Sequence, residues 1–319
     1  MGATVRAKAS GLSHNRGRIG AEDTSPRSSL ASLRLVLGVG RSGTTWVSHV
    51  FSSTLQPIRY CCEPLFYLHP RLAFHRKGDH TAVGYEEFEE GHPLLSAYLR
   101  LLDRDGFGVQ PDTLRRNDDD WSLCLVKEVH ALLGTEGLLR HCHPPTLFIL
   151  RDPLYVADSL FSAQSLGTAY LDHEAKAVQQ TNFLDRFLPG RQEDLERLFW
   201  VVRHSGRREQ MILTKVLCIR LLQKMFVMLA REFPCAQIIH YEELCTAPSE
   251  GLSAAAQALS LSWDHNMELS LAETSQADSI SADPYSVMRN TAEQVQRRFK
   301  FLSASDIALC RAMLEAIQE

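Results

Sequence analysis

The sequence has no hydrophobic run long enough to cross a membrane. The longest candidate, Met211–Ala230, is interrupted by Lys215, Arg220 and Lys224, whereas a membrane-spanning helix needs about 20 consecutive apolar residues. The N-terminal residues also lack the apolar core that a secretory signal requires. The net charge is −4 over 319 residues, so no basic field favours nucleic acid. We therefore expect a cytoplasmic protein with no membrane span and no nucleic-acid partner.

The sequence also lacks cysteines at regular spacings. Eight cysteines are present without a C-x-x-C pair, and without a secretory signal we expect them to be reduced thiols. Neither Cys61-Cys62 nor His141-Cys142-His143 has a second pair of ligands elsewhere at zinc-site spacing. The sequence therefore predicts no metal site.

Apolar runs and helical patterns alternate along the chain. Strands are predicted at Leu33–Leu37, Pro57–Cys62, Leu123–Val129, Thr146–Leu150 and Ala236–Tyr241. Helices are predicted at Thr44–Phe51, Leu132–His141, Pro153–Ser162, Glu193–Val202, Glu209–Phe233, Pro248–Leu259, Thr291–Arg298 and Ala304–Ile317. This alternation predicts an α/β fold of three layers, with a mostly parallel central sheet and helices on both faces.

The chain divides into a tail and one folded unit. Residues 1–32 are rich in Ser, Gly, Ala and Arg and show no periodicity, so we expect a disordered N-terminal tail. Residues 33–319 are predicted to form a single domain. Within it, residues 66–120 are irregular and too long for a simple connection, which indicates an insertion that covers a binding site.

The turn Gly38–Trp46 is the most informative segment, because it links the first predicted strand to the first predicted helix. Its G-x-x-x-x-G spacing is that of a P-loop, in which backbone N–H groups and a helix N-terminus surround an anion. Thr44 stands where a nucleoside-triphosphate P-loop has its lysine. The loop instead offers Arg41 and the hydroxyls of Ser42, Thr44 and Thr45.

A second segment with anion-binding character follows the strand Thr146–Leu150. Arg151 stands at the end of this strand, and Ser159 lies two turns along the next predicted helix. A guanidinium and a hydroxyl so placed can grip one phosphate together. The alternative is that Arg151 and Asp152 only cap the helix, for which Asp152 is a suitable N-cap residue and Pro153 a suitable first-turn residue.

Together the two segments resemble the sulfotransferases that use 3′-phosphoadenosine 5′-phosphosulfate (PAPS). The 5′-phosphosulfate loop of that family, [RK]-S-G-T-T-W, matches Arg41–Trp46. Its 3′-phosphate motif, R-[DN]-P with a serine eight residues after the arginine, matches Arg151 and Ser159. Weaker matches are Glu63-Pro64-Leu65 and Tyr241-Glu242-Glu243-Leu244. The resemblance is closest to the carbohydrate, tyrosyl-protein and soluble bacterial branches, and it implies a P-loop NTPase-like sulfotransferase fold.

The resemblance also implies a reaction. A sulfuryl group would pass from PAPS to an acceptor hydroxyl or amine, leaving 3′-phosphoadenosine 5′-phosphate (PAP), without a metal ion. Arg41 would stabilise the leaving phosphate, and the nucleotide would be bound by Arg41, Ser42, Gly43, Thr44, Thr45, Trp46, Arg151 and Ser159. For Trp46, a place in the core is an equally good interpretation. The acceptor is expected to be a small molecule, a carbohydrate or a lipid headgroup, with residues 66–120 as the acceptor-site insertion.

The acceptor needs a general base, and Glu63 is the first candidate by the same resemblance. The alternative role for Glu63 is a structural ion pair with Arg41 or Arg59. His130 is the second candidate for the base, and Lys127 would aid the sulfuryl group. The K-x-H pattern of the cytosolic branch is one residue longer here, which on a strand would turn His130 to the opposite face from Lys127.

Two other functions remain open at this point. A P-loop kinase or NTPase is disfavoured because position 44 has no lysine. A catalytically silent PAP-binding module would keep the pocket without turnover. The C-terminal segment that completes the nucleotide site in the family has no clear equivalent, and Arg289, Arg297 and Arg298 are its candidates.

Overall fold

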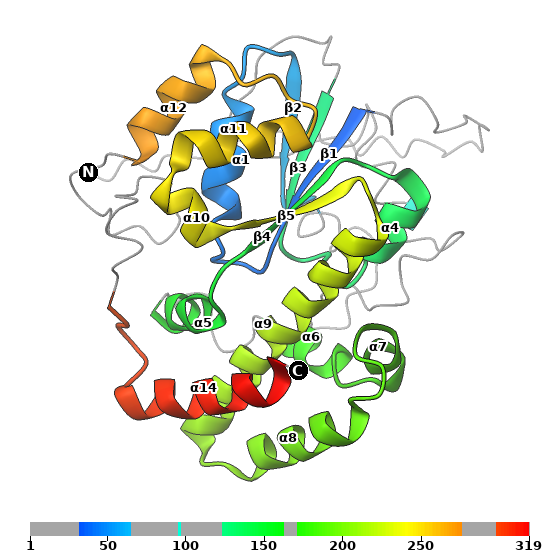
Figure 1. Ribbon diagram of the computed structural model, residues 1–319, viewed down its shortest axis with the longest axis vertical. Helices are drawn as coiled ribbons and strands as arrows, with labels where there is room; N and C mark the ends of the chain where they lie inside the picture. Colours follow the sequence, from blue (N-terminus) through cyan, green and yellow to red (C-terminus); the bar gives the residue numbers. More distant parts are fainter. Residues whose placement is uncertain (1–31, 65–94, 97–122, 163–170, 276–297, 319) are drawn as a thin grey trace, which may run out of the picture.

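The computed structural model describes residues 32–64, 95–96, 123–162, 171–275 and 298–318. Within them, five strands form one parallel sheet in the order β2-β3-β1-β4-β5 (Figure 1). The strands are β1 (Leu33–Leu37), β2 (Ile58–Cys62), β3 (Leu123–Glu128), β4 (Thr146–Leu150) and β5 (Ala236–His240). All five predicted strands are confirmed, and their ends differ from the prediction by at most one residue.

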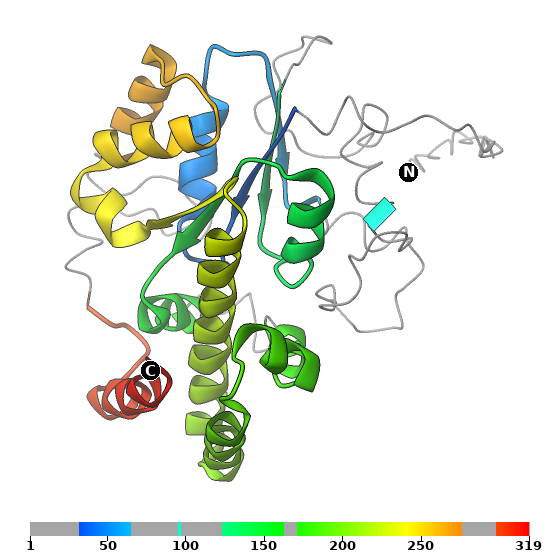
Figure 2. The ribbon, with the colours of Figure 1, turned by 45° about the vertical axis from the view of Figure 1, so that its right-hand side comes forward.

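Helices cover both faces of the sheet. They are α1 (Thr44–Ser52), α4 (Thr135–Cys142), α5 (Pro153–Ser162), α6 (Asp172–Ala177), α7 (Thr181–Phe187), α8 (Gln192–His204), α9 (Arg207–Glu232), α10 (Tyr241–Thr246), α11 (Pro248–Ala258), α12 (His265–Ser275) and α14 (Ala304–Gln318). One face carries α1, α10, α11 and α12, and the other is covered by α4 and the long helix α9, with α5 to α8 and α14 gathered around α9 (Figures 1 and 2). The predicted three-layer α/β fold is confirmed.

The sheet is buried on both faces because its strands are apolar at successive positions. In β1, Leu33, Leu35 and Leu37 belong to the core on the α9 side, whereas Val36 belongs to the core on the α1 side. Side chains of a strand alternate between faces, so a strand between two helical layers needs apolar residues at both sets of positions. Burial of both faces holds the sheet in place between its two helical layers.

Several predicted segments lie outside the described residues. They include most of the predicted tail 1–32 and of the insertion 66–120, and almost all of the predicted helix 291–298. Helix α4 begins at Thr135, three residues later than predicted, and α12 is a helix that was not predicted. Within the described part of the chain, no helix is both long enough and apolar enough to cross a membrane.

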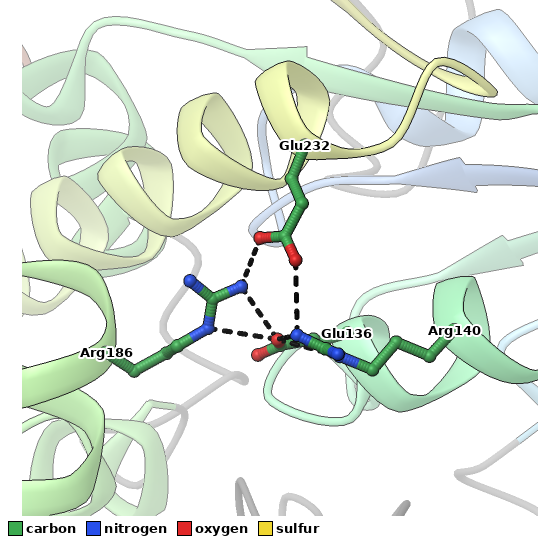
Figure 3. Close-up of polar contacts among 4 residues, drawn as sticks. All are labelled: Glu136, Arg140, Arg186 and Glu232. Atoms are coloured by element: carbon green, nitrogen blue, oxygen red, sulfur yellow. Dashed lines mark hydrogen bonds and ion pairs between the residues drawn. The ribbon is translucent and has the colours of Figure 1, made fainter.

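A cluster of four charged residues ties α4, α7 and α9 together on the side of the sheet that α9 covers (Figure 3). Glu136 of α4 is nearly buried, and its Oε1 accepts from Arg140 at 2.6 Å and from Arg186 of α7 at 2.8 Å. Both arginines also pair with Glu232 at the end of α9. Burial lowers the pKa of Arg186, but its bonds to Glu136 and Glu232 outweigh this and raise the pKa. The cluster is therefore a structural clamp between three helices.

Candidate active site

The candidate residues lie at one edge of the sheet. In a parallel sheet the carboxyl ends of all strands meet at one edge, where ligands of α/β proteins bind. The glycine-rich loop follows β1, Glu63 follows β2, Lys127 lies near the end of β3, and Arg151 follows β4. These four strands are neighbours in the order β2-β3-β1-β4, so the residues that were predicted separately gather at one place.

The glycine-rich loop is shaped by two glycines. At Gly38 a Cβ atom would lie 2.6 Å from Ser42 Oγ and 2.9 Å from the carbonyl oxygen of Ile149, so no side chain fits. Gly43 has φ +102°, and a Cβ there would lie 2.4 Å from the ring of Tyr241. Left-handed backbone of this kind favours glycine. The loop can therefore form only with glycine at both positions.

Helix α1 starts directly after this loop and has the features of an anion site. Gly43 is its N-cap, no side chain caps it, and its first turn has no acidic residue. The first N–H groups of a helix lack partners within the helix, and its dipole attracts negative charge. The hydroxyl of Ser42 is buried in the loop without a hydrogen-bond partner among the described residues. The loop therefore offers donors to a bound anion.

The loop contacts Ser159 in α5 and Arg151 just before it through its arginine. Nε of Arg41 donates to Oγ of Ser159 at 3.0 Å, and Nη1 of Arg151 donates to the carbonyl oxygen of Arg41 at 2.9 Å. Arg151 is buried, and its guanidinium carbon lies 4.5 Å from the centre of the Tyr241 ring. Oδ1 of Asp152 accepts from the N–H of Leu154, which confirms Asp152 as the predicted cap. The two predicted anion-binding segments thus adjoin each other.

Trp46 belongs to the core of the protein. Its side chain is fully buried, Nε1 donates to Oγ1 of Thr274 at 3.0 Å, and its ring meets Tyr241 edge to face. The structure thus shows the core position that was the alternative interpretation of Trp46, and a direct contact with the nucleotide stays a prediction. The tryptophan follows the loop at the start of an amphipathic helix, and its large apolar ring is buried between α1 and α12.

The second group of charges joins Glu63, Lys127 and His130. Nζ of Lys127 donates to Oε1 of Glu63, and Nε2 of His130 lies 3.4 Å from Oε2 of the same carboxylate. Lys127 is buried, whereas the side chains of Glu63 and His130 are each about one quarter exposed, at 27% and 25%. Glu63 has φ +51°, an unfavourable value for a side chain. Such strain concentrates at functional sites.

Each charge in this cluster acts on the others. Burial raises the pKa of Glu63, but His130 and Lys127 outweigh it and bring the pKa to about 2. Burial lowers the pKa of His130, but the carboxylates of Glu63, Glu128 and Glu174 outweigh it and raise the pKa. Glu63 is therefore a weak proton acceptor, whereas the pKa of His130 lies above its ordinary value.

The position of His130 corrects a prediction. A continuous strand would have turned His130 away from Lys127, but β3 ends at Glu128 and the chain bends after it. Lys127 and His130 consequently both contact Glu63. Alternation along a strand predicts side-chain directions only as far as the strand continues.

The C-terminal segment reaches the site through a residue that sequence reasoning missed. The carboxylate of Asp158 on α5 is buried and accepts the backbone N–H groups of Lys300, Phe301 and Leu302. This attachment brings the ring of Phe299 onto Tyr155, with the ring centres 4.6 Å apart. Arg289 and Arg297 lie outside the described residues, and Arg298 is exposed. A charged residue inside the apolar pattern of α5 was the only available signal.

A cavity of about 350 Å³ lies between α6, α8 and α9. Its walls include the buried Phe199, Val202 and Leu217, and Lys176 and Arg203 are among its charged residues. Ala175, which lines the cavity, directly follows Glu174 in the chain, and the charge of Glu174 raises the pKa of His130.

Within the described ranges, no group of three or more His, Cys, Asp or Glu side chains is arranged to hold a metal ion.

Comparison with known proteins gives only structural similarities. No family model and no curated protein matches the sequence. A sulfotransferase from Alicyclobacillus acidocaldarius is 18% identical, with a TM-score of 0.37 over 88% of this chain and 95% of that chain. The sulfotransferase domain of the Synechococcus PCC 7002 olefin synthase is 13% identical, with a TM-score of 0.40 over 88% of this chain and 94% of that one. Both neighbours are sulfotransferases, the family that the motifs resemble; at this level of similarity, the function proposed below rests on the site.

Proposed function

We propose that this protein transfers a sulfuryl group from PAPS to the hydroxyl or amine of an acceptor. The observation that carries the proposal is the contact between two anion-binding segments, in which Arg41 donates to Ser159 and Arg151 donates to the carbonyl of Arg41. Two guanidinium groups beside a helix N-terminus fit a ligand with two separate anionic groups. PAPS has such a pair in its 5′-phosphosulfate and its 3′-phosphate.

The residues divide between the two ends of this substrate. The loop from Ser42 to Thr45 binds the 5′-phosphosulfate through its N–H groups and hydroxyls, and Arg151 with Ser159 binds the 3′-phosphate. During transfer, the bond between sulfur and the phosphate oxygen breaks while the acceptor atom bonds to sulfur. Arg41 stabilises the negative charge that the leaving phosphate gains, as donors do in related transfer reactions. Trp46 acts indirectly, by anchoring the helix that follows the loop.

The acceptor proton goes to His130 in this proposal. A carboxylate with a pKa of about 2, such as Glu63, holds a proton too weakly, whereas an effective base has a pKa near the working pH. Because Nε2 of His130 faces Glu63, Nδ1 is the nitrogen that accepts the proton. Glu63 then orients the ring and stabilises the imidazolium, as the carboxylate does in a Ser-His-Asp triad. Lys127 adds positive charge for the sulfuryl oxygens.

The decisive experiment compares PAP with AMP, which differ only in the 3′-phosphate. Binding of both is measured by calorimetry to the wild type, Arg151→Ala and Arg151→Lys. A lost hydrogen bond to a charged group costs about 1.5–3 kcal/mol, so Arg151→Ala should weaken PAP binding about ten- to 150-fold and AMP binding much less. Arg186→Ala is the control, because it removes an arginine that pairs with Glu136 and Glu232 in the clamp of Figure 3. Equal losses for PAP and AMP would refute the 3′-phosphate assignment.

Turnover separates the remaining functions. Labelled PAPS is incubated with a panel of hydroxylated acceptors, and sulfated product is detected directly. Sulfated product that disappears in Arg41→Ala supports the proposal. Tight PAP binding without any product would indicate a silent binding module, and turnover of ATP with Mg²⁺ would indicate a kinase or NTPase.

A further inference from the structure

The segment from Lys127 to His130 has one residue too many for a simple strand. In an extended strand, Lys127 and Val129 would point to one face and Glu128 and His130 to the other. In the structure, Lys127 and His130 nevertheless contact the two oxygens of the same Glu63 carboxylate. Something must therefore end the strand between these two residues and turn His130 back.

Glu128 is the residue at that point. Its side chain is completely buried, and Oε1 accepts the backbone N–H groups of Val129 at 2.9 Å and of His130 at 2.8 Å. These N–H groups are consequently engaged locally, and the pairing of β3 with β1 ends at Leu37 and Glu128. A carboxylate that accepts two adjacent N–H groups fixes the turn that places His130.

Burying the carboxylate of Glu128 at the end of a strand costs free energy. A buried charge is tolerated only when it is paired or hydrogen-bonded, and hydrogen bonds to a carboxylate are stronger than those to a neutral acceptor. The same carboxylate also acts on the His130 ring. Among the residues that the structure describes, Glu63 after β2, Glu128 and, from α6, Glu174 act on the charge of this ring, and Lys127 adjoins Glu63.

We propose that Glu128 is a positioning residue that holds the His130 ring against Glu63 through the backbone of the intervening turn. Its catalytic meaning rests on the proposed function, in which His130 is the base. The contact between His130 and Glu63 is made by two side chains of the protein itself, so it can be measured separately from sulfuryl transfer. Glu128 thus restores the pairing that the additional residue between Lys127 and His130 would otherwise prevent.

The test measures the titration of His130 by NMR in histidine-labelled protein. The chain has 13 histidines, and the His130→Gln variant identifies the signal. Glu63→Gln is introduced into the wild type, Glu128→Gln and Glu128→Ala, so that its effect on the His130 pKa reports the contact between the two side chains. Glutamine keeps the acceptor oxygen of Glu128, whereas alanine removes it.

We expect Glu63→Gln to lower the His130 pKa in the wild type and in Glu128→Gln, and to have no further effect in Glu128→Ala. An equal effect in the alanine background would overturn the proposal. If Glu128→Ala does not fold, Glu128→Gln decides: persistence of the Glu63 effect supports positioning by the acceptor oxygen, and its loss contradicts it.

The matched control is Glu136→Gln, the same change at another buried glutamate, which accepts hydrogen bonds from Arg140 and Arg186. It should lower the melting temperature and leave the His130 titration unchanged; a moved titration would mean that the signal reports general loosening and would overturn the inference. Because the titration needs neither PAPS nor an acceptor, its failure and a failure of sulfuryl transfer are separate results.

Discussion

The Glu63→Gln variant tests how strongly the charge cluster at the end of β2 and β3 is coupled. Glu63 holds the buried Lys127 and the His130 ring, and its pKa falls from an ordinary 4.5 to about 2. Each pKa unit corresponds to about 1.4 kcal/mol of preference for the charged form. The ionised carboxylate therefore contributes about 3 kcal/mol to the free energy of unfolding at neutral pH, and the variant should lose about this amount.

The pH dependence has a definite sign. Because the pKa of Glu63 is lowered in the folded protein, its contribution is complete above about pH 4.5 and is lost as the pH falls toward 2. The pKa of His130 is raised above 6.5, so its contribution is complete below that value and is lost as the pH rises through the folded pKa. The pair should consequently stabilise the fold most between about pH 4.5 and 6.5.

The assay is urea unfolding of the wild type and Glu63→Gln at a series of pH values from 3 to 8. The difference in unfolding free energy should be largest near pH 5–6 and should shrink on acidification. Glu268→Gln is the matched control, since Glu268 pairs with His265 at 3.8 Å but both side chains are more than half exposed. Such surface pairs contribute little. A Glu63→Gln effect that is constant with pH, or no larger than the control, would refute the coupling.

Two further predictions concern the loop and the base. Gly43→Ala should lower the unfolding free energy by at least about 2 kcal/mol and abolish PAP binding, because φ is +102° and the new Cβ would meet the Tyr241 ring; calorimetry showing wild-type PAP affinity would contradict this. Glu174→Gln removes a negative charge that raises the His130 pKa, so the acidic limb of the pH dependence of kcat/KM should move to lower pH. A limb that stays in place or moves upward would argue against His130 as the base.

The strands of this protein were predictable because their signal is local. Runs such as Leu33–Leu37 and Thr146–Leu150 are apolar at successive positions, which is what a strand between two helical layers requires. The short helices α6 and α7 were not predicted. Each has fewer than eight residues and packs against α9, so its stability comes from tertiary contacts that no local pattern contains.

The two segments that approach each other in the candidate site were also recognisable from local sequence signals. The loop carries its own glycine, arginine and hydroxyl signals, and the segment after β4 carries an arginine and a hydroxyl. The parallel sheet brings both segments to one edge. The direction of His130 was not predictable, because it depends on how the carboxylate of Glu128 ends β3. The role of Asp158 was equally hidden, since its partners begin 142 residues further along the chain at Lys300.

Under the proposed function, the contact between Arg41 and the segment after β4 gives a reason why an arginine in the loop would replace the missing P-loop lysine. A lysine at position 44 would act from the first turn of α1, independently of β4. Arg41 instead donates its Nε to Ser159, while its own carbonyl accepts from Arg151. Each anion-binding segment therefore holds the other in place, and a ligand that engages only one of them leaves the other's donors without a charged partner. Under the proposed function, this mutual support would favour a doubly anionic nucleotide, since donors fixed before binding lose little freedom when the ligand arrives.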